Sequence, residues 1–248
     1  MARRDAQSGE GFCGLPATPV VARAGLHLWE EPCVSGARGS GAVFFSGCVL
    51  RCVYCQNHAI SHENFGKPVS VERLREIFWE LIGQGAHNIN LVSPTPFAPA
   101  IREALAEPLP VPVVWNTGGY ERVETLRSLE GGLSQDLSGA ADYFGAASAA
   151  IREMVRQTGD YVLEAGLLKR GVLIRHLMLP GQLENTKAVL DWVAETFRPG
   201  QVLLSLMAQY TPQPGAEGLL SRRVTGAEYR AALRYMENLG ITDGYCQD

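Results

Sequence analysis

The chain has 248 residues, enough for one large domain to bury its core without disulfides. Hydrophobic residues make up 46% and charged residues 19% of it, as in ordinary globular proteins. A net charge of −4 gives no attraction to nucleic acid or anionic membranes, and no apolar stretch is long enough to span a bilayer, so we expect a cytoplasmic protein with neither partner.

The predicted domain begins near residue 42. Residues 1–41 are Gly-rich and weakly periodic, and we predict a loose N-terminal segment there, followed by one domain over residues 42–248. Residues 42–45 (AVFF) predict a short buried strand that ends at Ser46-Gly47.

Helices and strands then alternate along the chain. Ser70 is a favourable N-cap for a helix whose apolar residues, such as Leu74, Ile77 and Leu81, recur at helical spacing. We predict helices over residues 70–82, 99–107, 121–130, 146–157, 184–197 and 225–239, and strands over residues 88–92, 112–116, 171–179 and 202–208. This alternation is typical of a parallel α/β sheet. Residues 131–145 break it, because they contain no β-branched residue and predict no strand.

The carboxyl ends of parallel strands meet at one edge, where functional groups gather. We therefore expect polar residues that follow the predicted strands to lie at one rim: Cys48, Ser93, Thr95, Asn116, His176 and Gln209.

Three cysteines follow the first predicted strand at a spacing of C-x3-C-x2-C: Cys48, Cys52 and Cys55. In a reducing compartment, clustered cysteines indicate metal or redox chemistry. Electron-transfer iron–sulfur clusters usually have four cysteine ligands, so three ligands leave one iron open to another molecule. The spacing therefore favours a cluster that takes part in chemistry.

Other interpretations of the three thiols remain open. His58 follows three residues after Cys55 and completes a possible zinc ligand set, which would make the chain a non-catalytic interaction module. A disulfide with one spare thiol, or three inert buried thiols, are further alternatives.

The stretch GCVLRCVYC resembles the signature of the radical S-adenosylmethionine (radical SAM) superfamily. The stretches around it, with GAHNINLVSPTPFAP, NTGGY, GVLIRHLMLPG and SLMAQYTP, resemble the PflX-like subgroup, which is related to pyruvate formate-lyase activating enzymes. The resemblance implies an incomplete parallel (β/α)6 barrel, a [4Fe-4S] cluster on the three cysteines, and S-adenosylmethionine (SAM) on the open iron. Tyr54 matches the aromatic position near the adenine.

The resemblance also implies the reaction and the partners. SAM would be cleaved reductively to methionine and a 5′-deoxyadenosyl radical, which abstracts a hydrogen atom from a substrate. An electron donor such as a flavodoxin or ferredoxin, and a protein substrate such as a glycyl residue of a partner enzyme, are the implied partners. A degenerate member that binds a cluster without turnover is a further alternative.

Several residues match or replace the subgroup's SAM contacts. Where activating enzymes carry Gly-Gly-Glu for the SAM amino group, this chain has Ser93-Pro94-Thr95-Pro96, so the oxygens of Ser93 or Thr95 are the candidates. Asn116 precedes glycines that allow a close backbone approach. Arg175 and His176 are adjacent on a predicted strand and must face opposite sides. We expect Arg175 to face inward and bind the SAM carboxylate.

Other polar residues are weaker candidates. Gln209 and Tyr210 follow the last predicted strand and are candidates for the substrate mouth, whereas His58 and His62 are expected to be solvated.

The chain departs from the subgroup in two places. PflX-like chains open with further paired cysteines, of which only Cys13 is present here. The family also places its fourth strand near residues 131–145, ending in an Asp-x-Lys-type contact to SAM, and this segment has only Asp136. We therefore expect a barrel that lacks its fourth strand.

Overall fold

The computed structural model describes residues 15–48, 50, 52, 54–121, 123, 126, 133–136 and 143–248, with the backbone alone for residues 133–136. Nine of its strands form one sheet in the order β11-β10-β9-β6-β5-β4-β2-β1-β3. These strands are β1 (Val20–His27), β2 (Ser40–Phe45), β3 (Lys67–Pro68), β4 (Ile89–Val92), β5 (Val113–Thr117), β6 (Leu133–Asp136), β9 (Val172–Leu177), β10 (Val202–Met207) and β11 (Gly244–Gln247). A separate hairpin pairs β7 (Val162–Glu164) with β8 (Leu167–Arg170).

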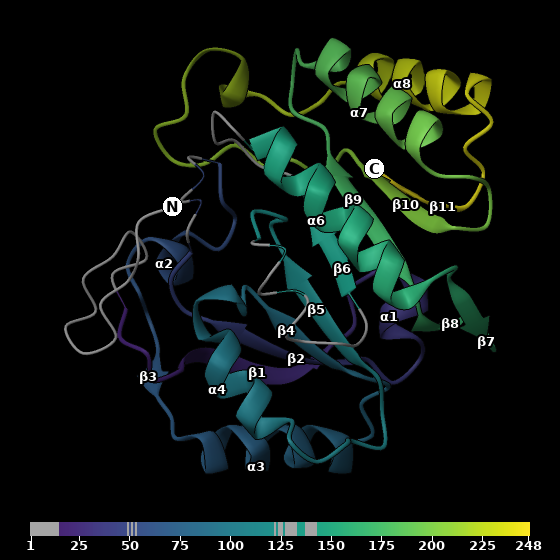
Figure 1. Ribbon diagram of the computed structural model, residues 1–248. Helices are drawn as coiled ribbons and strands as arrows, with labels where there is room; N and C mark the ends of the chain where they lie inside the picture. The colour runs from purple at the N-terminus through teal and green to yellow at the C-terminus, as the bar shows by residue number, and fades with distance from the viewer. Residues whose placement is uncertain are drawn as a thin grey trace.

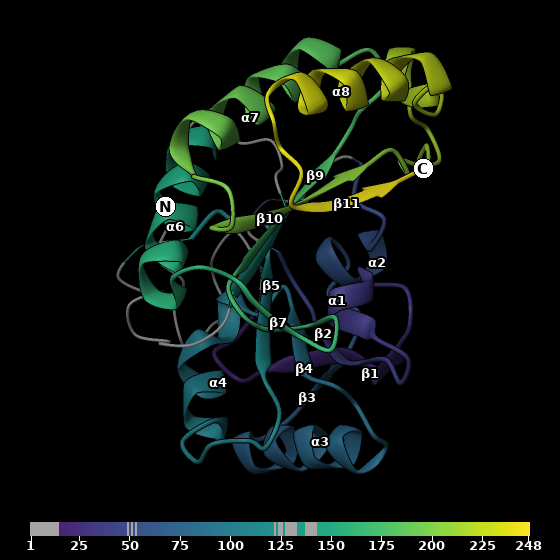
Figure 2. The same ribbon diagram turned by 90° about the vertical axis from the view of Figure 1, so that its right-hand side faces the viewer.

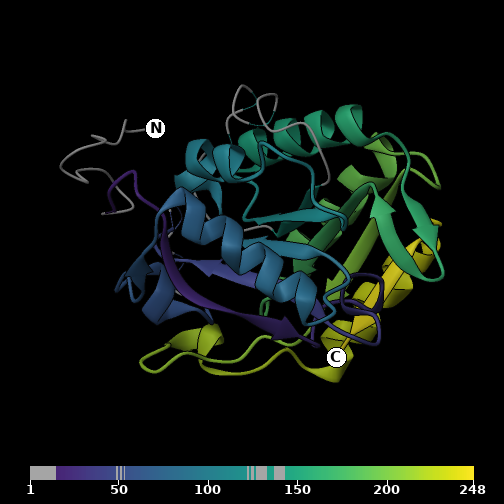
Figure 3. The ribbon, with the colours of Figure 1, turned by 90° about the horizontal axis from the view of Figure 1, so that it is seen from below.

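The sheet is mixed, with a parallel body and an antiparallel edge. The strands from β2 to β11 in the sheet order pair in parallel, whereas β1 pairs antiparallel with β2 and with β3. The sheet twists strongly, so that the strands near β1 and those near β11 run in very different directions (Figures 1 and 2). From below, the strands follow an arc from purple β1 through teal to green and yellow (Figure 3). The parallel α/β class is confirmed.

The helices connect the strands and bury one face of the sheet. They are α1 (Pro32–Ser35), α2 (His58–Ser61), α3 (Val71–Gly83), α4 (Ala98–Ala104), α6 (Tyr143–Thr158), α7 (Leu183–Thr196) and α8 (Gly226–Asn238), with 3-10 turns η1 (Thr95–Phe97) and η2 (Gly218–Ser221). Figure 2 shows α4, α6 and α7 on one side of the strands and α1 and α2 on the other.

The helix α3 shows why the sequence folds as predicted. The Ser70 side chain accepts a hydrogen bond from the Arg73 backbone at 3.1 Å, which caps the helix. The predicted apolar residues are then buried, including Leu74, Ile77 and Leu81. They pack into the main core with sheet residues of the helix-facing side. Five of the six predicted helices have counterparts in α3, α4, α6, α7 and α8; most of the sixth, at residues 121–130, lies outside the described residues.

The opposite face of the sheet carries several polar residues beside the apolar contacts of Leu173 and Leu203 with α1. In-register pairing places Asn90, Arg175 and Ser205 on that face, and Asn88 follows the same alternation. Asn88 accepts a hydrogen bond from the Ser40 hydroxyl at 2.6 Å and donates one to the Val34 backbone at 2.7 Å. This network anchors α1 against the polar face.

The prediction of a missing fourth strand is wrong. Residues Leu133–Asp136 form β6, which pairs in parallel with β5 on one side and β9 on the other. Its sequence, Leu-Ser-Gln-Asp, has little intrinsic preference for a strand. Two neighbouring strands supply hydrogen-bond partners along both of its edges, and this tertiary context overrides the weak preference. The sheet is therefore continuous at the place where a gap was expected.

The described part of the N-terminal segment is not loose. Residues 20–27 form β1 along β2, Leu15 is buried in the main core, and Cys33 and Val34 of α1 pack against Leu173. The prediction failed because β1 lies beside the edge of the sheet and its residues vary from buried to exposed without a clean alternation. Cys13 lies outside the described residues.

No helix in the described part of the chain is long and apolar enough to cross a membrane.

Candidate active site

The cysteine loop connects the end of β2 to α2. The strand ends at Phe45, and Gly47, with φ of +75°, turns the chain. The Gly47 backbone then donates a hydrogen bond to the Ile60 carbonyl at 2.9 Å, which ties the start of the loop to α2. Cys48, Cys52 and Cys55 are all half-buried, and no disulfide joins any of the described cysteines. The loop therefore holds three thiols at the carboxyl end of the first parallel strand.

The sulfur atoms of Cys48 and Cys55 accept hydrogen bonds. The Leu50 backbone donates to Cys48 Sγ at 3.5 Å, and the Ser61 hydroxyl donates to Cys55 Sγ at 3.3 Å. The Cys55 backbone N–H donates a hydrogen bond to the Cys52 carbonyl at 3.0 Å, which tightens the turn between these two cysteines. Hydrogen bonds to thiolate sulfurs stabilise their negative charge and tune the potential of a bound cluster.

The metal-ligand assignment of these cysteines stays a prediction. Among the described residues, no three His, Cys, Asp or Glu side chains lie close enough together to hold a metal ion. The side chains of residues 49, 51 and 53, which separate the cysteines, are outside the described part. The assignment rests on the spacing of the cysteines and on the resemblance of the surrounding stretch to the radical SAM signature.

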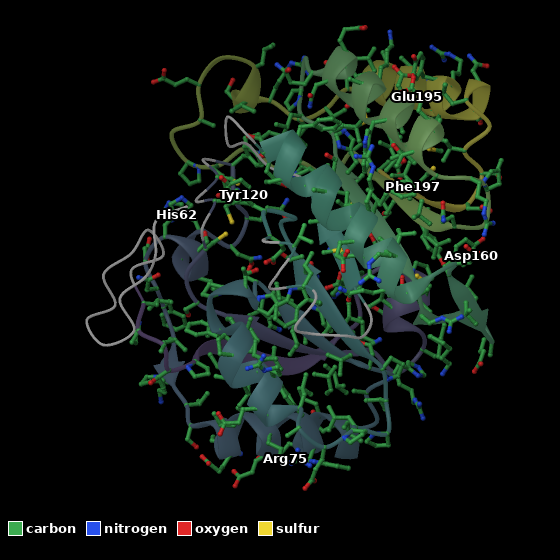
Figure 4. The ribbon with its side chains drawn as sticks, viewed as in Figure 1. His62, Arg75, Tyr120, Asp160, Glu195 and Phe197 are labelled. Carbon is green, nitrogen blue, oxygen red and sulfur yellow. The ribbon has the colours of Figure 1, made fainter. Side chains whose placement is uncertain are left out.

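A pocket lies beside Cys48, where β2, β4 and β5 end. Its lining includes Cys48, Ser93, Thr95, Thr117 and Tyr120. Figure 4 labels Tyr120 near this end of the sheet. Ser93 has φ of +57°, a left-handed conformation that is unfavourable for a residue with a side chain and often occurs at functional sites. Its backbone N–H bonds the Asn116 carbonyl at 2.9 Å, which joins the ends of β4 and β5.

The pocket confirms part of the predicted rim. It brings Cys48, Ser93 and Thr95 together, although they come from two different loops. Asn116 is half-buried in β5, next in the chain to Thr117, which lines the pocket. Tyr54 is half-buried in the cysteine loop. The roles of Tyr54, Ser93, Thr95 and Asn116 as SAM contacts stay predictions.

Behind the pocket lies Glu121, a residue that the sequence did not single out. Its Oε1 accepts hydrogen bonds from the hydroxyls of Thr95 and Thr117, the latter at 2.5 Å, and from Trp115 Nε1 at 3.4 Å. The side chain is buried, and burial raises the pKa of the Glu121 carboxyl despite these bonds. Its other oxygen, Oε2, is buried and has no hydrogen-bond partner among the described residues. The NTGGYE stretch, with an acidic residue just after a strand, was the available signal.

The two histidines of the cysteine loop interact with each other. The rings of His58 and His62 stack with centroids 4.2 Å apart, and His58 Nδ1 lies 3.4 Å from a Glu63 oxygen. His62 Nδ1 is 2.7 Å from the Ser61 hydroxyl, the same hydroxyl that bonds Cys55. The Ser61 hydroxyl therefore links the His62 ring to the Cys55 sulfur. His58 is engaged with His62 and Glu63, which gives no support to the zinc alternative.

Arg175 and His176 face opposite sides of β9, as predicted. His176 packs on the helix side, with Nε2 3.1 Å from the Thr186 hydroxyl of α7, and burial lowers its pKa to about 4. Arg175 lies on the polar face, where its guanidinium contacts Glu31 at 2.9 Å and Glu30 at 3.3 Å. These ion pairs join Arg175 to the N-terminal segment; a contact with the SAM carboxylate stays a prediction.

The end of β10 also approaches the cysteine loop. The Gln56 side chain donates to the Gln209 carbonyl at 3.4 Å, which joins two segments far apart in the sequence. Tyr210 is buried, and its hydroxyl donates to the Leu220 carbonyl at 2.8 Å. Of the two residues predicted at the mouth, only Gln209 is exposed.

The fold and the site define an α/β protein with a thiol-rich loop and a small pocket that contains hydroxyl groups at the carboxyl edge of a parallel sheet. The sequence model of the Radical SAM superfamily matches residues 42–193, more than half of the chain. The chain therefore belongs to the radical SAM superfamily.

Two individual proteins are similar to this chain. An uncharacterized protein of Methanocaldococcus jannaschii, MJ0674, is 29% identical over 252 residues, which cover 95% of this chain and 72% of that protein. The crystal structure of QueE from Escherichia coli superimposes with a TM-score of 0.51 at 11% identity and covers 93% of both chains. At this identity the QueE likeness supports the fold alone. Neither of these two proteins confirms that the chain belongs to the PflX-like subgroup.

Proposed function

We propose that this chain is a radical SAM enzyme in which Cys48, Cys52 and Cys55 hold a [4Fe-4S] cluster and the adjacent pocket receives SAM. Members of the superfamily generally bind both groups. When bound and reduced, they supply a 5′-deoxyadenosyl radical that abstracts a hydrogen atom from a substrate. The observation that carries the proposal is the pocket that Cys48 shares with Ser93, Thr95 and Thr117.

The residues of this edge fit that role chemically. Three thiols leave a cubane cluster with one open iron. The hydroxyl oxygens of the pocket can accept hydrogen bonds from an amino group next to that iron. The loop is also partly shielded, since the three cysteines are half-buried, and limited solvent access helps to protect a reactive species.

The substrate and the partners form the finer part of the proposal. By resemblance to the PflX-like proteins, we propose a glycyl residue of a partner enzyme as the substrate and a flavodoxin or ferredoxin as the electron donor. The resemblance in the SPTP, NTGGY and SLMAQYTP stretches supports this.

The test is anaerobic reconstitution with iron and sulfide, followed by incubation with SAM and dithionite. We expect about four irons and four sulfides per chain, and we expect 5′-deoxyadenosine as a product. The variant Cys52→Ala should lose the cluster and the product. Cys246→Ser is the matched control, because Cys246 is an exposed cysteine of β11 outside the loop.

Three outcomes would contradict the proposal in different ways. One zinc without sulfide would support the interaction module. A cluster without 5′-deoxyadenosine would support a degenerate member. Full iron content in Cys52→Ala would show that the ligand assignment is wrong.

A further inference from the structure

We propose that Ser61 and His62 form a hydrogen-bond relay to the Cys55 sulfur, which raises the reduction potential of the cluster bound there. His62 is the positioning residue of this relay, because it directs the Ser61 proton onto the sulfur. The inference rests on the proposed function, since it takes Cys55 as a cluster ligand. It names the side chains that set how easily this cluster takes up an electron.

The first step is the position of the Ser61 hydroxyl. Ser61 is 5% exposed and is the last residue of α2, where its backbone N–H donates to the Asn57 carbonyl at 2.9 Å. The preceding residue, Ile60, accepts the hydrogen bond from Gly47 that ties α2 to the start of the cysteine loop. The backbone therefore holds the hydroxyl beside Cys55, with Oγ and Sγ 3.3 Å apart.

The second step is the number of protons. Ser61 Oγ carries one proton. Three acceptors lie within its reach: Cys55 Sγ at 3.3 Å, His62 Nδ1 at 2.7 Å and the His58 carbonyl at 3.5 Å. The carbonyl contact is the longest, and this carbonyl already accepts the His62 backbone N–H at 2.8 Å. The proton is therefore shared out between the sulfur and the His62 ring.

The third step is the tautomer of His62. A thiolate that binds iron has no proton of its own, so its hydrogen bond with Ser61 needs the Ser61 proton. A bare Nδ1 at 2.7 Å would take that proton, because its contact with the hydroxyl is much the shorter. The proton is available to the sulfur when Nδ1 carries a hydrogen and donates to Ser61 Oγ. A chain then runs from the ring through the hydroxyl to the sulfur, and each bond in it polarises the next.

The stacked partner of His62 supports its ring without joining the chain. The rings of His58 and His62 (labelled in Figure 4) have centroids 4.2 Å apart and planes inclined by 9°. His58 Nδ1 lies 3.4 Å from Glu63, and His58 meets the Ser61 hydroxyl through its backbone carbonyl alone. The two histidines are thus neighbours of similar chemistry, and only the ring of His62 contacts Ser61.

The consequence is a change in the reduction potential. Reduction adds a negative charge to the cluster, and a hydrogen bond to a ligand sulfur stabilises that charge. The relay therefore makes the cluster easier to reduce, which eases the task of the electron donor.

The test is a redox titration of the reconstituted protein without SAM, followed by electron paramagnetic resonance. Ser61→Ala removes the donor to the sulfur. We expect full iron content and a roughly tenfold smaller equilibrium constant for reduction, which for one electron is a shift of about 59 mV to more negative potential. Ser61→Thr keeps a hydroxyl and should keep the wild-type potential.

The two histidines provide a matched pair of variants. His62→Phe keeps a flat ring against His58 but has no N–H for Ser61, and we expect a shift in the same direction as in Ser61→Ala. His62→Asn returns an amide N–H near the position of Nδ1 and should recover part of that shift. His58→Phe leaves the bond between Ser61 and His62 in place and should keep the wild-type potential.

A wild-type potential in Ser61→Ala, or equal shifts in His58→Phe and His62→Phe, would overturn the inference. If Ser61→Ala assembles no cluster, the two histidine variants decide the question by the same comparison. If the wild-type protein itself assembles no [4Fe-4S] cluster, the proposed function fails and this inference falls with it.

Discussion

Replacement of Arg175 by Met tests whether this side chain anchors the N-terminal segment to the sheet. The Arg175 side chain is 17% exposed, and its partners are buried more deeply, with Glu31 at 1% and Glu30 at 8%. Glu30 also accepts a hydrogen bond from Asn90 at 3.0 Å. Methionine fills most of the volume but leaves two buried carboxylates without this cation.

The expected cost follows from the burial. Removing one partner of a buried ion pair typically destabilises a protein by about 3–5 kcal/mol. For a chain of this size, each kcal/mol lowers the melting temperature by about 2–4 °C, so Arg175→Met should melt about 6–20 °C lower. The assay is thermal unfolding followed by circular dichroism. Arg170→Met is the matched control, because Arg170 is exposed in β8.

A double variant and a binding measurement complete the test. Arg175→Met with Glu31→Gln should recover part of the lost stability, because one unpaired carboxylate is then neutral. The reasoning is refuted if Arg175→Met leaves the melting temperature unchanged. A selective loss of SAM affinity with intact iron content and stability would instead support the carboxylate contact that the sequence predicts.

Two further predictions concern stability. The folded-state pKa of His176, about 4, lies below its ordinary value of 6.5. As the pH falls, His176 is therefore protonated in the unfolded chain before it is protonated in the folded protein. This difference should lower the free energy of unfolding by about 3 kcal/mol between pH 6.5 and pH 4. Chemical denaturation over this range should show a shallower loss for His176→Gln than for wild type; equal slopes would contradict the assignment. Glu228 completes a capping box with Thr225 and accepts a bond from the Gly181 backbone at 2.8 Å. Glu228→Ala should cost about 1–2 kcal/mol, and the exposed Glu237→Ala on the same helix should cost much less.

The elements with strong local patterns could be predicted from the sequence. The spacing of Leu74, Ile77 and Leu81 defined α3, and the alternation along β9 correctly placed Arg175 and His176 on opposite sides. Local pattern did not reveal β6, because that strand depends on its neighbours β5 and β9 for its hydrogen bonds.

The candidate site was partly predictable for the same reason. The cysteine spacing and the strand ends indicated Cys48, Ser93 and Thr95, and the structure places these three at one pocket. Glu31, which pairs with Arg175, lies 144 residues away in the chain, and no local signal connects the two. Glu121 was missed because its hydrogen bonds come from Trp115 and Thr117 of β5 and from Thr95 of the turn after β4, which the local sequence does not connect to it.

The central claim is that three thiols hold a cluster whose fourth iron is open to SAM. Electron paramagnetic resonance of the anaerobically reconstituted and reduced protein, with and without SAM, tests it most directly. The account predicts a [4Fe-4S] signal that changes on addition of SAM and is absent from Cys52→Ala. A protein with no such signal, or a signal that SAM does not alter, would contradict it.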